Sequence, residues 1–300
     1  MPRQVQWDRM FVDELEAAFA ACPVVYFPQG LCEPHGPQCA LGLDALKAHA
    51  IACAAAREGG GIVAPTDFWH CHEVGGYGYF GNHYVGEVQR TWLTALPPWM
   101  HFKNVCYHVR QADAIGFHAA IFFTGHYGPN WQDLKEMLAL IQPHVGTRLY
   151  GLPDFEANVP GFDSDGNSGG DHAGKVETSL LWAVLPDCVD VSRIPPVGEP
   201  GTHWAMGPDA RRADRRVGER MVADEVRYLT AKAAELLADY DRLKPAHTLR
   251  TFGQVEQLWA EVVRPAMDKF RTMQWDWHDH PLPPKDSRWY ENAQMPKSPP

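Results

Sequence analysis

Short apolar runs alternate with amphipathic stretches along the first half of the chain. Four runs rich in β-branched and aromatic residues have the length of buried strands: PVVYFPQG (23–30), GGIVAP (60–65), FHAAIFFTG (117–125) and TRLYGLP (147–153). Helical periodicity is found at 10–21, 43–58, 86–96, 99–114 and 130–144. Strands that alternate with crossover helices are typical of a mostly parallel sheet covered on both faces, so the pattern predicts an α/β fold.

The pattern changes near residue 207, where long helical stretches begin, and a Trp- and Pro-rich tail follows residue 273. With 300 residues, 45% of them hydrophobic, the chain can bury one large core. We therefore predict a core over residues 1–206. We expect the C-terminal helical extension and tail, 207–300, to pack on that core or on a neighbouring subunit.

Charge and cysteine content narrow the class of function. The formal net charge is -10, from 27 Lys and Arg against 37 Asp and Glu, which argues against a nucleic-acid surface. The first residues lack the uninterrupted apolar run of a signal peptide, and no later run has the length of a membrane span, so a cytoplasmic location without membrane contact is the expectation. Seven scattered cysteines indicate neither a disulfide framework nor a cysteine zinc site. These features favour chemistry on a small molecule.

Residues of the metal-ligand type follow the predicted strands. Glu33, His35 and Asp44 come after the first run, and His126 lies in a glycine-flanked turn after the third. In parallel sheets, ligands bind beyond the carboxyl ends of the strands. Imidazole and carboxylate together suit Zn²⁺, and Mn²⁺ accepts a more oxygen-rich set. Two such ions, roughly 3.5–4 Å apart and bridged by a carboxylate, can form a hydrolytic site.

Three segments resemble motifs of the creatininase (creatinine amidohydrolase) family. FPQGLCEPHGPQCALGLD (27–44) is similar to the family's Gly-x-x-Glu-x-His-Gly and the Leu-x-x-Asp that follows it. TGHYGPN (124–130) resembles Asn-Gly-His-Gly-Gly-Asn, and DHAGKVETS (171–179) resembles His-Ala-Gly-x-x-Glu-Thr-Ser. The segments occur in the family's order. The resemblance implies a three-layer α/β/α fold with a mostly parallel central sheet, two divalent ions (Zn and/or Mn) and a homo-oligomer, often a hexamer.

Carried over residue by residue, the resemblance implies two ligand sets. Glu33, Asp44 and His126 would hold one ion. His35, Asp44 and Glu177 would hold the other, so that Asp44 would bridge the two ions.

The resemblance also assigns a catalytic role and reveals departures. His172 would donate or accept a proton without binding metal. Creatinine-cleaving members carry a glutamate two residues after the turn histidine, where this chain has Gly128, although Tyr127 matches. Thr124 replaces the usual Asn, and YFGNH (79–83) replaces a Pro-Gly-Thr turn. The pocket is therefore not expected to be built for creatinine.

The segment WHCHE (69–73) has histidines at a two-residue spacing, which alone could bind zinc. Because the ligand sets are already complete, we expect such residues to line the substrate pocket. The predicted substrate contacts are His70, His83 and Tyr127.

Three functions are compatible with these residues. The leading hypothesis is a dinuclear-metal-dependent hydrolase of a small cyclic amide or related C–N substrate. The resemblance also allows hydrolytic carbon–carbon ring opening of an oxidised cyclitol or sugar, as in relatives that hydrolyse a dehydro-inosose. A non-catalytic metal-binding scaffold is the third, and the retained His172 argues against it.

Overall fold

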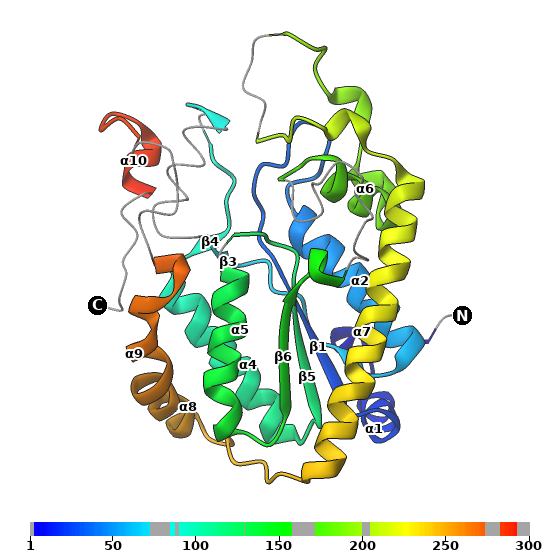
Figure 1. Cartoon of the computed structure of the whole chain (residues 1–300), viewed down its shortest axis with the longest axis vertical. Helices are drawn as coiled ribbons and strands as arrows, with labels where there is room; N and C mark the ends of the chain where they lie inside the picture. Colours follow the sequence, from blue (N-terminus) through cyan, green and yellow to red (C-terminus); the bar gives the residue numbers. More distant parts are fainter. Residues whose placement is uncertain are drawn as a thin grey trace.

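A parallel sheet forms the centre of the molecule (Figure 1). The computed structural model describes residues 3–72, 85–87, 90–128, 130–157, 172–199, 205–273 and 283–292. Within them the main sheet has the order β2-β1-β5-β6, with bounds Ile62–Val63, Val24–Gln29, Ala119–Thr124 and Arg148–Pro153. Every neighbouring pair is parallel; Val24 lies opposite Ala119, and Ala119 opposite Arg148. All four predicted strands are confirmed.

Helices connect and cover these strands. Before residue 207 they are η1 (Trp7–Arg9), α1 (Val12–Ala21), α2 (Leu43–Gly59), α4 (Pro98–Ile115), α5 (Asn130–Ile141), η3 (Gln142–His144), η4 (Asp154–Ala157), α6 (Lys175–Val184), η5 (Pro186–Cys188) and η6 (Val191–Arg193). After it they are η7 (Ala210–Arg212), α7 (Arg215–Leu243), α8 (Phe252–Leu258), the π-helical η8 (Trp259–Val263), α9 (Arg264–Ala266), η9 (Met267–Lys269), η10 (Arg271–Met273) and α10 (Arg288–Asn292).

The two faces of the sheet bury two separate cores. Because side chains alternate along a strand, Val24 and Tyr26 of β1 face α2 and α7, whereas Val25 and Phe27 face α4, α5 and α8. Strand β1 is buried at every position, as expected for a strand covered on both sides. The result is the predicted α/β/α arrangement, with α2 and α7 on one side of the sheet in Figure 1 and α4 and α5 on the other.

The predicted helix at 86–96 is wrong. The chain there ends in β4 (Ala95–Leu96), which pairs with β3 (His70–Cys71), and residues 90–94 are not helical. Trp92 has a left-handed φ of 53°, and Pro97 and Pro98 follow directly, which disfavours helical backbone before them. The Thr94 hydroxyl donates to the Phe68 carbonyl at 2.5 Å and accepts the Cys32 N–H at 2.8 Å. These contacts hold the segment extended.

The residues after 207 pack on both cores. Helix α7 lies against α2 and α6, and α8 with η8 covers α4 and α5. In the tail, Trp289 is fully buried against Val85, and its indole N–H donates to the Gly86 carbonyl at 2.8 Å. The tail thus packs on its own chain at this point, while Trp275 and Trp277 lie outside the described residues. The domain division at residue 207 stays a prediction.

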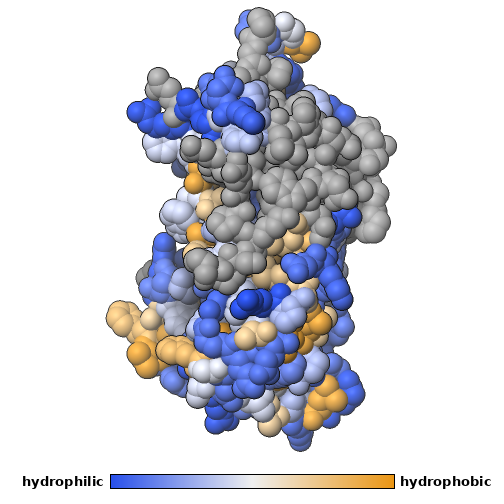
Figure 2. All heavy atoms as spheres, turned by 90° about the vertical axis from the view of Figure 1, so that its left-hand side faces the viewer, coloured by the Kyte–Doolittle hydropathy of each residue, from blue (hydrophilic) through white to orange (hydrophobic). Residues whose placement is uncertain are grey.

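Figure 2 shows the described residues on the side formed by α8 and α9 as mostly hydrophilic, with separate hydrophobic patches. Among the described residues, none of the helices combines the length and apolarity needed to cross a bilayer.

A buried carboxylate ties the C-terminal extension to the sheet layers. Asp113 of α4 is fully buried and accepts hydrogen bonds from the backbone N–H groups of Gly146, Thr147 and Leu249 at 2.8, 2.9 and 2.8 Å. His247 Nδ1 lies 3.0 Å from the same carboxylate. The Asp113 carboxylate therefore accepts hydrogen bonds from backbone N–H groups in two loops, where no pairing between strands supplies an acceptor.

We predict that Asp113→Ala lowers the free energy of unfolding by about 3–4 kcal/mol, because it leaves several buried N–H donors without an acceptor. Urea denaturation followed by circular dichroism measures this loss. The exposed Asp241→Ala is the control and should change stability by no more than about 0.5 kcal/mol. Equal midpoints for the two variants would contradict the role of Asp113.

Candidate metal centre

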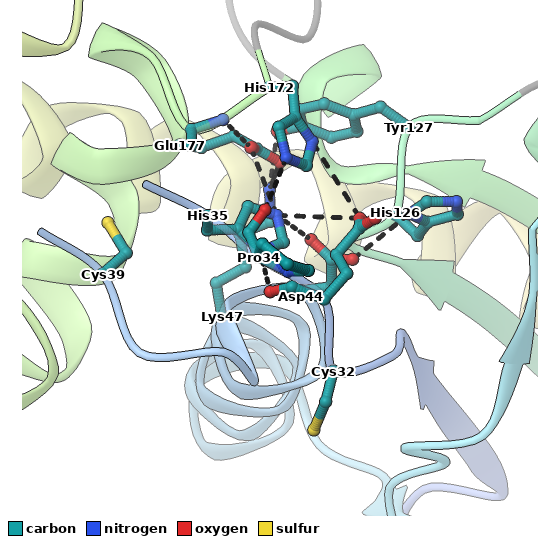
Figure 3. Close-up of polar contacts among 12 residues, drawn as sticks. Cys32, Pro34, His35, Cys39, Asp44, Lys47, His126, Tyr127, His172 and Glu177 are labelled. Atoms are coloured by element: carbon teal, nitrogen blue, oxygen red, sulfur yellow. Dashed lines mark hydrogen bonds and ion pairs between the residues drawn. The ribbon is translucent and has the colours of Figure 1, made fainter. Parts of the chain in front are cut away.

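The predicted ligands come together at the carboxyl edge of the sheet (Figure 3). Glu33 and His35 lie in the loop after β1, and Asp44 is the second residue of α2. His126 is the second residue after β5, and Glu177 lies in the first turn of α6. All five side chains are at most 4% exposed. Three segments that are distant in sequence, 33–44, 126 and 177, thus contribute to one buried cluster.

Two glycines allow the start of α2 to approach the strand ends. A Cβ atom at Gly30 would lie 2.4 Å from the Ala45 nitrogen, and one at Gly125 would lie 2.2 Å from the Asp44 carbonyl oxygen. Both distances are shorter than any tolerated contact, so only glycine fits. Asp44 is therefore held by its backbone directly above β1 and β5.

The first ligand set consists of Glu33, Asp44 and His126. His126 Nδ1 lies 3.0 Å from Glu33 Oε1 and 3.2 Å from Asp44 Oδ2. One ligand atom from each residue falls within 4.8 Å of the other two. One nitrogen and two carboxylate oxygens form a donor set that suits Zn²⁺ or Mn²⁺.

The second set consists of His35, Asp44 and Glu177. His35 Nε2 lies 3.1 Å from Asp44 Oδ1 and 3.6 Å from Glu177 Oε2. The other ring nitrogen, Nδ1, donates to the Glu33 carbonyl at 3.0 Å, because a carbonyl can only accept. This bond fixes the tautomer and turns the Nε2 lone pair toward the carboxylates. Asp44 directs Oδ2 to the first set and Oδ1 to the second.

The electrostatics of the cluster are those of a site that requires positive charge. Burial opposes ionisation, yet His126 and His172 hold the pKa of Glu33 well below its usual range. Burial likewise opposes charge on His35, but Asp44, Glu177 and Glu33 raise its pKa to about 9. Protons on the histidines thus compensate the carboxylates in the absence of other cations.

The cluster also fits a cation because its central atoms make no hydrogen bonds. Asp44 Oδ1 and His35 Nε2 are fully buried and form an ion pair at 3.1 Å, but neither atom makes a hydrogen bond within the described part of the chain. Buried polar atoms are normally paired, since leaving them unpaired costs about 1–3 kcal/mol each. An oxygen and a nitrogen that converge in this way match the donor chemistry of a divalent ion.

His172 lies in the turn before α6, beside the ligands. Its ring stacks on His35 with centroids 4.4 Å apart, and its Nε2–H donates to the Pro34 carbonyl at 2.8 Å. The other nitrogen, Nδ1, lies 4.0 Å from Glu33 Oε1. Burial and the neighbouring His35 lower the pKa of His172. His172 also falls within ligand distance of Glu33 and His35, so geometry alone permits a ligand role.

Lys47 is a buried neighbour of the candidate ligands that was not predicted from the sequence. It is fully buried in α2, and its Nζ lies 2.8 Å from Glu177 Oε1, 3.0 Å from Asp154 Oδ2 and 2.8 Å from the Tyr127 hydroxyl. Burial disfavours its charge, but the two carboxylates raise the pKa of Lys47. The available signal was position: Lys47 is one turn after Asp44, on the apolar face of α2.

The other oxygen of Glu177 is held from the opposite side. Glu177 Oε2 accepts the backbone N–H of Ala173 at 2.7 Å, and Ala173 has a left-handed φ of 48°. Lys47 and Ala173 together fix the carboxylate plane, so that Oε2 is the oxygen closer to His35.

The predicted substrate contacts have different surroundings. Tyr127 packs its ring over Lys47, 4.0 Å from Nζ to the ring centroid, and edge-on against Phe155. His70 is 1% exposed and lies behind His126, with ring centroids 5.6 Å apart. His83 lies outside the described residues. The substrate roles of these three residues stay predictions.

A further histidine borders the first set. His72 Nε2 lies 3.5 Å from Glu33 Oε2, whereas His126 Nδ1 lies beside the other oxygen, Oε1. Its ring is 5.1 Å from that of His126. The segment WHCHE thus places two histidines, His70 and His72, next to His126.

Comparison with known proteins agrees with this geometry. The family model described as Creatininase: Creatinine amidohydrolase matches residues 8–239. None of the curated proteins matches the chain.

Several solved structures share the fold. A structure described as "Creatininase Mn" has 22% identity and a TM-score of 0.63, over 78% of this chain and 98% of its own. A mutant creatininase described as "Zn-Zn type" has 24% identity and a TM-score of 0.60, with the same coverages. A putative creatinine amidohydrolase from Bacteroides fragilis NCTC 9343 has 19% identity and a TM-score of 0.60, over 79% of this chain and 98% of its own.

These structures support the fold, and the family model supports the motif resemblance. Their descriptions include manganese and zinc, the two metals that suit the donor sets of this chain. Because the family match spans more than two thirds of the sequence, the protein belongs to the creatininase (creatinine amidohydrolase) family.

Proposed function

We propose that the protein is a hydrolase that uses two divalent ions to cleave a small cyclic amide or a related carbon–nitrogen bond. The observation that carries the proposal is the pair of three-residue ligand sets that share Asp44, one through each carboxylate oxygen. Such a shared carboxylate is the arrangement found in two-ion hydrolytic sites.

Charge balance supports two ions rather than one. Five buried carboxyl groups lie in or beside the centre, and Lys47 is the only fully buried Lys or Arg among the described residues. Two divalent ions together with Lys47 would balance five carboxylates. The five are Glu33, Asp44, Asp154, Glu177 and Glu225. Burial raises the pKa of Asp154 to about 6, and the neighbouring Lys47 opposes that shift.

Each ion would have two ligands of its own and share Asp44 with the other ion. Glu33 and His126 would bind the first ion, His35 and Glu177 the second, and Asp44 both. Zinc, manganese or one of each fits these donors. When bound, such ions polarise a substrate carbonyl and lower the pKa of a water molecule toward 7.

His172 would move the proton. Since its Nε2–H is committed to the Pro34 carbonyl, Nδ1 is the basic nitrogen, and it faces Glu33. As a carbon–oxygen bond to water forms and the carbon–nitrogen bond breaks, Nδ1 accepts a proton from the water and passes it to the leaving nitrogen. A non-catalytic metal-binding scaffold would not require a histidine placed for proton transfer beside the ligands.

The substrate is expected to differ from creatinine. Gly128 occupies the position of the acid that creatinine-cleaving relatives carry. A second candidate is carbon–carbon ring opening of an oxidised cyclitol or sugar, which the hydrogen-bonding capacity of His72 beside Glu33 favours. Turnover of cyclic amides, cyclic ureas and oxidised cyclitols by the Zn²⁺- or Mn²⁺-loaded protein, with and without chelator, distinguishes the two candidates.

We predict two equivalents of divalent ion per chain. Asp44→Ala should lose both ions because it belongs to both ligand sets, whereas His35→Ala should weaken the second site preferentially. Inductively coupled plasma mass spectrometry after dialysis gives the metal content. His118→Ala, remote from the centre, is the control and should retain two equivalents. A reproducible value of one in fully active protein would rule out the two-ion site.

His172→Ala should retain the metal and lose turnover. The expected decrease in kcat is about 10²–10⁴-fold, the range for removal of a general acid–base group. Glu33→Ala is the matched comparison, since it should lose metal and activity together. If His172→Ala loses an ion, the histidine is a ligand; if it retains full turnover, it is structural.

We also propose a homo-oligomer, with a hexamer as the expected size. Trp69 and Trp92 are 55% and 65% exposed next to the paired strands β3 and β4, and large exposed aromatics favour an interface. Sedimentation velocity at micromolar concentration should show an assembly, and Trp92→Glu should shift it toward monomer. A monomeric parent protein would contradict this proposal.

A further inference from the structure

We propose that Lys47 leaves Glu177 only one oxygen for an ion, and that this restriction raises the preference of the second ligand set for zinc over manganese. The inference rests on the proposed two-ion site, and it concerns which metal that site selects. Lys47 does not bind an ion itself. It is a positioning residue that acts through Glu177.

Lys47 is surrounded by oxygens. Its side chain is fully buried, and Nζ lies 2.8 Å from Glu177 Oε1, 3.0 Å from Asp154 Oδ2 and 2.8 Å from the Tyr127 hydroxyl. The Tyr127 ring also covers the ammonium group, with its centroid 4.0 Å from Nζ. Because an ammonium group has three N–H donors, Lys47 has one neighbouring oxygen for each of them. It therefore has no reason to turn away from Glu177.

The two oxygens of Glu177 have different neighbours. Oε1 accepts a hydrogen bond from Lys47. Oε2 accepts the Ala173 N–H at 2.7 Å, and it is also the oxygen that lies 3.6 Å from His35 Nε2. A carboxylate can bind an ion through one oxygen or through both. An ion that approached Oε1 would meet the positive charge of Lys47, so Oε2 is the oxygen that an ion can reach.

The backbone holds both donors in place. Lys47 is three residues after Asp44 in α2, and the start of this helix rests on the ends of the central strands. On the opposite side, the Ala173 carbonyl accepts the side-chain N–H of Gln38 at 2.9 Å, and Gln38 is 2% exposed. Neither donor can therefore follow a rotation of the Glu177 carboxylate.

A carboxylate restricted in this way favours zinc. Zinc sites in proteins usually have four ligands, whereas manganese accepts a larger and more oxygen-rich set. The second set supplies a nitrogen from His35 and carboxylate oxygens from Asp44 and Glu177. With Oε1 bound to Lys47, Glu177 adds one oxygen to this set. Without Lys47, it could add two, which suits manganese better.

A simpler explanation is that Lys47 only compensates the charge of Asp154 and Glu177. The two explanations differ in what they predict for metal selectivity. Zinc and manganese ions both carry two positive charges, so a change in charge alone alters both affinities by the same factor. The ratio of the two affinities therefore reports on the ligands and not on the charge.

The test replaces Lys47 by Met, which has a similar length and no charge, in the full-length protein. Chelator competition gives the Zn²⁺ and Mn²⁺ affinities of each site. In Lys47→Met, the ratio of Zn²⁺ to Mn²⁺ affinity should fall by about 10-fold at one of the two sites, the lower end of the range for loss of a group that orients a ligand. At the other site, the ratio should stay at the parental value.

Cadmium NMR assigns the effect to one ion. The parent protein loaded with Cd²⁺ should give two resonances, and His35→Ala identifies the second one by its loss. Oxygen ligands move a cadmium resonance to lower frequency than nitrogen ligands do. In Lys47→Met, the second resonance should therefore move to lower frequency, while the first stays in place as an internal control.

Two further variants make the result specific. Asp154→Asn removes another partner of Lys47 but keeps its contact with Glu177, so the ratio and both resonances should stay at the parental values. The double variant Lys47→Met/Asp154→Asn also removes the carboxylate that the single variant leaves without its cation. It should fold even if Lys47→Met does not, and it should show the same changes in ratio and resonance.

Three outcomes decide against the inference. If Lys47→Met, or the double variant in its place, keeps the parental ratio and both resonances, Lys47 serves only as a compensating charge. If both resonances move, the substitution disturbs the whole centre and Lys47 does not act through Glu177. If the parent protein binds fewer than two ions, the proposed function itself fails, which is distinct from either result.

Discussion

Mutual repulsion among buried carboxylates is the constraint on which this structure depends. At the carboxyl edge of the sheet, Glu33, Asp44 and Glu177 occupy one volume with almost no exposure to solvent. Like charges in a medium of low dielectric constant cost several kcal/mol unless opposite charge lies beside them. The chain supplies that charge from His35, His126 and Lys47. The fold around the site is an arrangement of backbone that brings these groups together.

Lys47 has a different part in this balance from the histidines. Its bond to Glu177 Oε1 leaves Oε2 as the oxygen directed at His35, and its contact with Asp154 links the centre to the end of β6. A histidine can release its proton when an ion binds, because its nitrogen then becomes the ligand. Lysine stays charged, so it orients Glu177 both before and after binding.

Much of the fold could be predicted from the sequence, because strands buried on both faces and helices between them leave strong patterns. The helix expected at 86–96 failed because its apolar spacing looked helical while Pro97, Pro98 and the side-chain bonds of Thr94 favour extended backbone. Motifs around Glu33, His126 and Glu177 indicated the site. The contacts of Lys47 with Asp154 and Glu177 could not be predicted, since they join segments far apart in the chain.

The close approach of Gly30 and Gly125 to Asp44 makes the spacing of the two ligand sets a property of the backbone. The shared carboxylate has no freedom to slide, because the peptide that carries it rests on the ends of two central strands. A related enzyme could change pocket residues, or the metal it selects, without altering this spacing. It could not widen the spacing without separating a helix from the sheet. Substrate choice and the spacing of the two ligand sets can therefore diverge at very different rates within one scaffold.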